Sequence, residues 1–257
     1  MRVADPAHNQ VIAMHGWSGD SSAWKPWQRH FEHQGWHWQS GERGYGAFPP
    51  VQPRWQETTG CTAARRVVIG HSLGPHLVEA EVLGCATDVV LLTSFGRFVP
   101  AGAAGRALRS ALMGMHNALG SDGERAMLER FLARAALPAP ASALPAPASA
   151  LPPGPLQTGL TPDGRRRLDQ DLQRLLHTSG LPAGFPRTAR VLVVDAADDA
   201  IVAPEARLEL LERLQDHLDR PPEHWTLQDA GHALLVPDLL VRVQHWLDAP
   251  PATGPTT

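Results

Sequence analysis

Short apolar runs alternate with longer amphipathic stretches along the chain. The runs are rich in Val, Ile and Leu and lie at residues 11–14, 66–69, 88–92 and 190–194. Short β-branched runs of this kind are typical of strands buried on both faces of a parallel sheet. Helical stretches at 73–83 and 204–218 lie between or after them. The alternation predicts an α/β fold, a mostly parallel sheet flanked by helices.

The segment 97–187 breaks this alternation. It contains no strand pattern over roughly ninety residues, far more than an ordinary connection, but three helical stretches at 105–119, 122–136 and 161–177. We expect an inserted helical lid at 97–187, with 1–96 and 188–250 forming the core domain. The alternative is that these helices simply cover the sheet.

Low-complexity sequence lies inside the expected lid. The heptad Ala-Leu-Pro-Ala-Pro-Ala-Ser occurs twice, at 136–142 and 143–149. Repeated proline removes backbone donors, so an extended polyproline-type loop is predicted over 136–155. The Pro- and Thr-rich end, 251–257, is expected to be a flexible tail.

Composition narrows the class of protein. The chain has 257 residues, a net charge of −3 and two cysteines, Cys61 and Cys85. This balance gives no general attraction to nucleic acid, and two cysteines are too few for a disulfide framework. No apolar run reaches eighteen residues, and residues 1–10 lack the apolar centre of a signal peptide. We therefore expect a cytoplasmic protein with no membrane span and no nucleic-acid partner.

The strongest chemical signal is Gly70-His71-Ser72-Leu73-Gly74, directly after the apolar run 66–69. A serine hydroxyl becomes a useful nucleophile only when it is exposed, oriented and next to a base. A sharp turn between a strand and a helix presents the serine in this way. The context makes Ser72 the candidate nucleophile, rather than an incidental serine in a glycine-rich turn.

A second signal, His15-Gly16-Trp17, follows the apolar run 11–14. In hydrolases with a serine elbow, the loop at this place gives a backbone N–H to the substrate oxyanion. The N–H groups of Trp17 and Leu73 are therefore expected to form the oxyanion hole.

The acid and the base should follow the serine in that order. Asp199 lies just past the run 190–194, and His232 lies in Gly231-His232-Ala233. The spacing predicts a triad of Ser72, Asp199 and His232, with Asp198 and Asp195 as competing candidates for the acid.

Other tempting groups carry less weight. His30, His33 and His37 recur at helical spacing, but Gly35 interrupts that spacing and no HExxH motif is present. We expect no metal and no organic cofactor. Five tryptophans are expected to pack the core and the rim of a pocket: Trp17, Trp24, Trp27, Trp36 and Trp38.

With these motifs in view, the chain resembles α/β hydrolases, and its triad, oxyanion and elbow motifs carry that resemblance. A narrower resemblance, to pimeloyl-ACP methyl ester esterases of biotin synthesis, rests on Trp17 after His-Gly and on the stretch 129–133. It implies an α/β-hydrolase fold and substrate contacts from Trp17 and Phe131. It also implies docking of acyl carrier protein on lid arginines, here Arg165, Arg166, Arg167 and Arg174. The short Pro-rich stretch 48–64 and the loop 136–155 depart from that family.

The sequence therefore predicts a serine esterase that hydrolyses a small acyl ester, with pimeloyl-ACP methyl ester as the expected substrate. A broad short-chain carboxylesterase or thioesterase is the alternative using the same triad. A non-catalytic binding protein with this fold is the alternative of another class.

Overall fold

A computed structural model describes residues 9–56, 65–137, 154–234, 236 and 238–249. Its centre is a parallel sheet of six strands in the order β2-β1-β3-β4-β5-β6. The strands are β1 (Gln10–Met14), β2 (His37–Gly41), β3 (Arg66–His71), β4 (Asp88–Leu92), β5 (Arg190–Ala196) and β6 (Glu223–Leu227). All four predicted apolar runs are strands of this sheet, so the predicted fold class is confirmed.

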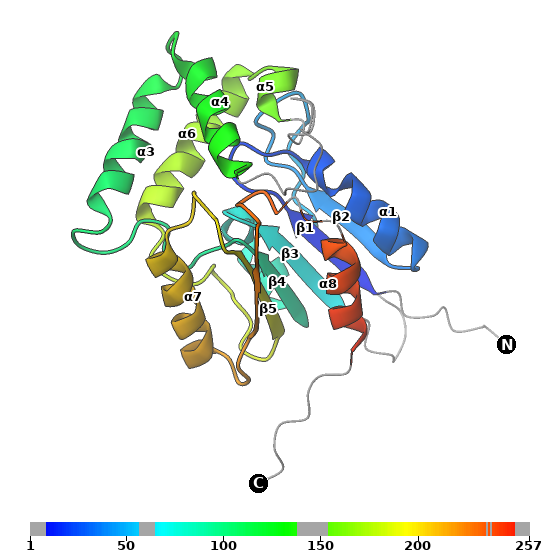
Figure 1. Ribbon diagram of the computed structural model, residues 1–257. Helices are drawn as coiled ribbons and strands as arrows, with labels where there is room; N and C mark the ends of the chain where they lie inside the picture. Colours follow the sequence, from blue (N-terminus) through cyan, green and yellow to red (C-terminus); the bar gives the residue numbers. More distant parts are fainter. Residues whose placement is uncertain (1–8, 57–64, 138–153, 235, 237, 250–257) are drawn as a thin grey trace, which may run out of the picture.

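Two apolar cores lie on opposite faces of the sheet, because side chains alternate along each strand. In β1, Val11 and Ala13 join one core, whereas Ile12 and Met14 join the other. The first core is closed by α1 (Lys25–His33) and α8 (Leu239–Asp248), which lie together on one side of the sheet (Figure 1). The second is closed by helices that include α7 (Pro204–His217).

The helices between β4 and β5 gather at one end of the molecule (Figure 1). They are α3 (Arg106–Ala118), α4 (Glu124–Ala135), α5 (Pro155–Thr158) and α6 (Pro162–His177). Three of them match the helices predicted at 105–119, 122–136 and 161–177 within two residues. Most of the predicted loop 136–155 lies outside the described residues, and so does the tail 251–257. None of the described helices is long and apolar enough to cross a membrane.

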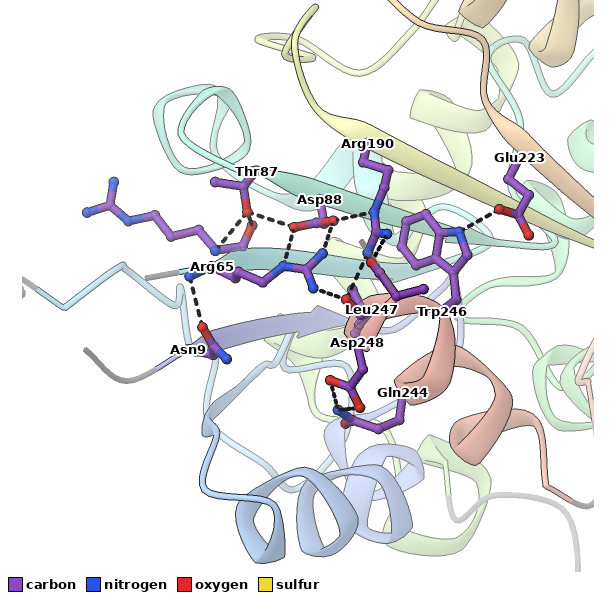
Figure 2. Close-up of polar contacts among 12 residues, drawn as sticks. Asn9, Arg65, Thr87, Asp88, Arg190, Glu223, Gln244, Trp246, Leu247 and Asp248 are labelled. Atoms are coloured by element: carbon purple, nitrogen blue, oxygen red, sulfur yellow. Dashed lines mark hydrogen bonds and ion pairs between the residues drawn. The ribbon is translucent and has the colours of Figure 1, made fainter. Parts of the chain in front are cut away.

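An ion network around the buried Asp88 carboxylate, with two partly exposed arginines, holds α8 at the amino ends of the central strands (Figure 2). The Asp88 carboxylate accepts hydrogen bonds from Arg65, at 2.6 and 3.1 Å, and from Arg190, at 2.9 Å. Arg190 also donates to Leu247 O at 3.0 Å and lies 4.0 Å from the Trp246 ring centre. Three strands and the end of α8 are therefore held together opposite the carboxyl ends of the strands.

The prediction of one continuous helix over 73–83 is wrong. The structure has a short 3-10 helix, η2 (Gly74–Leu77), extended backbone at Val78 and Glu79, and then α2 (Ala80–Gly84). A continuous helix would use His76 O as the acceptor for the N–H four residues later. Arg174 Nη1 donates to that carbonyl instead, at 2.9 Å. A tertiary contact thus replaces the helical hydrogen bond.

The region before β3 also differs from what the pattern of apolar residues predicts. Strand β2 was not predicted, because His37-Trp38-Gln39-Ser40-Gly41 lacks an apolar run. His37 lies in this strand, whereas His30 and His33 lie in α1, so the three histidines do not share one helical face. Between β2 and β3, the described residues 42–56 contain an isolated bridge from Glu42 to Val51 and no helix.

Candidate active site

Ser72 occupies a strained turn at the end of β3. Its φ of 55° lies in the left-handed region that L-residues rarely adopt. The turn is held by hydrogen bonds from Ser72 N to Leu92 O, at 2.9 Å, and from Ser94 Oγ to Ser72 O, at 2.8 Å. The Ser72 hydroxyl hydrogen-bonds none of the described residues, and Ser72 lines a cavity. This is the geometry that an elbow nucleophile requires.

Two glycines let the oxyanion loop lie directly against this turn. A Cβ atom on Gly16 would lie 2.8 Å from Ser72 Cβ. A Cβ atom on Gly74 would lie 2.2 Å from Met14 O, at the end of β1. No larger residue fits at either position without moving the backbone. The two signals found in the sequence, about 55 residues apart, therefore meet in space.

His232 and Asp199 are brought together as predicted by their order. His232 Nδ1 lies 2.9 Å from Asp199 Oδ2, and both side chains are almost fully buried. The other carboxylate oxygen accepts the N–H groups of Ile201 and Val202, at 2.7 and 2.9 Å. Burial alone would raise the pKa of Asp199, but the bonds from His232 and these N–H groups lower it below its usual value. The carboxylate is thus ionised and accepts a hydrogen bond from Nδ1, which leaves Nε2 as the His232 nitrogen not engaged by Asp199.

The competing acids lie elsewhere. The Asp198 residue is exposed. Asp195 is buried, and its Oδ2 lies 2.9 Å from His224 Nε2 on β6. Among the three candidate acids, Asp199 alone contacts His232 in the described structure.

The main chain of His232 is also held. Its carbonyl accepts hydrogen bonds from His71 Nε2, at 2.9 Å, and Thr93 Oγ1, at 3.0 Å. Burial, together with the nearby His232, lowers the pKa of His71 to about 4. His71 is therefore neutral near pH 7 and acts on His232 through the backbone, a contact that sequence reasoning missed.

The candidate oxyanion donors are Trp17 N–H and Leu73 N–H. Within the described part of the chain, neither group donates to a protein acceptor. The Trp17 indole donates to Leu168 O of α6 at 2.9 Å, and its ring meets Phe131 of α4 edge-on at 4.9 Å. The Trp17 side chain is thus held by α4 and α6, while the Trp17 N–H stays available.

A cavity of about 500 Å³ joins these groups. Its polar wall includes His15, His71, Ser72 and His232. The rest is mostly apolar and includes Trp17, Trp24, Trp27, Phe131, Leu132, Leu234, Val236, Leu239 and Leu240. No Asp, Glu, Lys or Arg is among the described residues that line it. Such a cavity suits an apolar organic group.

The sequence predicts some of the residues that line this cavity and not others. Trp17, Trp24 and Trp27 line the cavity, as expected for rim residues. Trp36 and Trp38 pack with Phe31 in the core instead. Leu234, Leu239 and Leu240 were missed, because their positions near the start of α8 carry no motif that distinguishes them from core residues.

No hydrogen bond joins Ser72 to His232 in this structure, although both line the cavity. The hydrogen bond between nucleophile and base is often long or absent before substrate binds. Ser72 and His232 therefore face one cavity, with Asp199 behind His232 and no hydrogen bond yet between serine and histidine.

The four arginines of α6 that were expected to dock a carrier protein have partners within the protein. Arg165 pairs with Glu124 at 2.5 and 2.9 Å, and Arg166 pairs with Asp163 at 2.5 Å. Arg167 donates to Gly44 O at 3.0 Å, and Arg174 to His76 O. Arg174 also lies 3.7 Å from a carboxylate oxygen of Asp171. Because three of the four pair with carboxylates, this surface is less positive than the sequence alone indicates. Docking of a carrier protein stays a prediction.

Similar solved structures share the fold at low sequence identity. An esterase from Exiguobacterium antarcticum matches with a TM-score of 0.67 and 14% identity, over 95% of this chain and 93% of that one. MGS-M2, an α/β hydrolase enzyme from a Medee basin deep-sea metagenome library, matches with a TM-score of 0.59 and 13% identity, over 99% and 94%. The bottromycin epimerase BotH, in complex with bottromycin A2, matches with a TM-score of 0.55 and 15% identity, over 93% and 89%.

No protein-family model and no curated protein sequence matches the chain. The presence of an epimerase among the similar structures means that fold alone does not decide the reaction. What the likeness shows is that the chain has the α/β-hydrolase fold.

Proposed function

We propose that the protein is a serine carboxylesterase that works through an acyl-enzyme. One observation carries the proposal: the unpartnered hydroxyl of Ser72 and the His232–Asp199 pair line or border one apolar cavity. A binding protein with this fold has no need for a strained serine turn together with a buried, charge-stabilised histidine.

The proposed reaction has two halves. His232 Nε2 takes the Ser72 proton as Oγ attacks the ester carbonyl, and Trp17 N–H and Leu73 N–H stabilise the resulting oxyanion. The C–O bond to the alcohol then breaks, and the alcohol leaves with the proton from His232. Water next attacks the acyl-enzyme, giving its proton to His232, and the acid departs as Oγ regains that proton. Asp199 stabilises the imidazolium in both halves.

The cavity favours an uncharged, apolar ester. Burying a carboxylate among Trp24, Trp27 and Leu239 would cost several kcal/mol without a charged partner. We therefore expect hydrolysis of p-nitrophenyl butyrate and hexanoate, and at least roughly tenfold lower kcat/KM for a monosuccinyl ester of equal length. Steady-state kinetics on the three esters test this. Equal rates on the charged and uncharged esters would contradict the substrate class, and no hydrolysis of any would contradict esterase function.

The narrower proposal is a pimeloyl-ACP methyl ester esterase. Its support is the contact of Phe131 with Trp17 above the cavity and the arginines along α6. A carrier-bound methyl ester would place its small alcohol beside Ser72 and its acyl chain along the apolar wall. The broader alternative is a short-chain carboxylesterase or thioesterase, which needs no carrier contact.

The arginine surface gives a test between these substrates. Arg165→Ala with Arg166→Ala should raise KM for a carrier-bound methyl ester by roughly two- to tenfold, because each exposed charge pair contributes about 0.2–1 kcal/mol. Turnover of p-nitrophenyl butyrate should not change. The control is Arg125→Ala, which removes an exposed arginine of α4. An equal loss on both substrates would assign the arginines to lid stability, and no loss on either would remove this support for carrier docking.

A further inference from the structure

The C-terminal end of α4 touches three of the four loops that carry the candidate catalytic groups, all but the Ser72 turn. Ala135 O accepts a hydrogen bond from Ala233 N, next to His232, at 2.9 Å. Arg134 Nε donates to Ala200 O, next to Asp199, at 2.9 Å. One turn earlier, the Phe131 ring packs on Trp17 of the oxyanion loop.

These contacts come from one short piece of helix. Residues three and four apart lie on the same helical face, so 131, 134 and 135 point toward the same side of α4. The loops they meet follow three different strands, β1, β5 and β6. The end of α4 lies above the carboxyl ends of the strands, where these loops begin (Figure 1). A single rigid element thus bridges loops that are far apart in sequence.

The Arg134 contact has little obvious value for stability. The Arg134 residue is exposed, so its single hydrogen bond to a carbonyl contributes little against solvent. Its position is specific, however, because the carbonyl belongs to the residue that follows Asp199. Misplacing an oriented catalytic group by a fraction of an ångström lowers turnover far more than it lowers stability.

We propose that the end of α4 sets the relative positions of the acid, base and oxyanion loops, and that Arg134 is a positioning residue for Asp199. This inference rests on the proposed esterase function. In this role Arg134 contacts no substrate atom and acts only through the loop at Ala200. The lid helix would then complete the site as well as cover it.

The test compares arginine variants of one helix. Arg134→Ala should lower kcat for p-nitrophenyl butyrate by about tenfold, with KM within about twofold and Tm within about 4 °C. Arg134→Lys keeps a cationic donor and should recover most of the loss. The matched control is Arg125→Ala, whose exposed side chain pairs with Glu129 of the same helix and hydrogen-bonds no loop among the described residues.

A second measurement separates positioning from folding. The rate at which a fluorophosphonate modifies Ser72 should fall in Arg134→Ala in parallel with kcat, while circular dichroism stays unchanged. Wild-type kinetics in Arg134→Ala, or an equal loss in Arg125→Ala, would overturn the inference but leave esterase function standing. A loss of kcat that lysine does not recover and that follows the fall in Tm would also overturn it. An inactive, unlabelled wild type would overturn the proposed function as well.

Discussion

Replacing Ser72 with alanine should abolish ester hydrolysis while leaving the fold intact. In the proposed mechanism Oγ forms the acyl bond, and residues 70–74 of this turn contain no other hydroxyl or thiol that could replace it. Loss of a serine nucleophile costs roughly 10⁴–10⁶-fold in turnover in related chemistry. The Ser72 hydroxyl hydrogen-bonds no described residue, so its removal leaves no partner unsatisfied.

The measurement is kcat on p-nitrophenyl butyrate together with thermal unfolding. Ser110→Ala is the matched control, since Ser110 is an exposed serine on α3. Ser72→Ala should unfold within a few degrees of the wild type. Retention of wild-type turnover by Ser72→Ala would contradict the nucleophile, and equal losses in both variants would point to contamination or misfolding.

Replacing Asp199 with asparagine should cost nearly as much. The amide would no longer stabilise the His232 imidazolium, and it favours the tautomer that leaves Nε2 protonated and unable to act as base. The expected loss in kcat is roughly 10⁴-fold, as in a serine protease with the same change. Asp198→Asn is the control, because Asp198 is exposed and is the residue directly before Asp199 in the same loop.

Kinetics on both asparagine variants decide the acid. Asp198→Asn should stay within about threefold of the wild type, since surface substitutions seldom disturb a buried site. If Asp198→Asn were the more damaging change, the acid role would move to Asp198 and the hydrogen bond at Asp199 would be structural. A small loss in Asp199→Asn alone would mean that the buried pair is not part of the reaction.

Local sequence patterns were enough to predict four of the six strands and the order of the candidate site residues along the chain. A buried strand is formed by Val67, Val68 and Ile69, because a short apolar run is stable chiefly where both of its faces are covered, as in the middle of a parallel sheet. Ser72 was found because its glycines have a steric role, which the close approach of Gly74 to Met14 O explains. Asp199 followed from chain order together with its distance past β5.

The sequence could not predict elements and contacts that depend on residues far apart in the chain and that no local sequence pattern marks. Strand β2 forms because its edge pairs with β1, although His37 and Gln39 break the apolar pattern. The helix after Ser72 is interrupted at Val78 and Glu79, and the nearby His76 carbonyl accepts a hydrogen bond from Arg174, about 100 residues later. Likewise, nothing in the sequence of α4 shows that Arg134 reaches Ala200. Each depends on tertiary placement, which outweighs local propensity.

The central claim is that Ser72 is the group that becomes acylated. Intact-mass measurement after treatment with a fluorophosphonate, followed by peptide mapping, tests it directly. The proposed mechanism predicts one added phosphonyl group per chain, on the peptide that contains Ser72, and none on Ser72→Ala. Modification at another residue, or an unmodified wild type under conditions where it hydrolyses p-nitrophenyl butyrate, would contradict it.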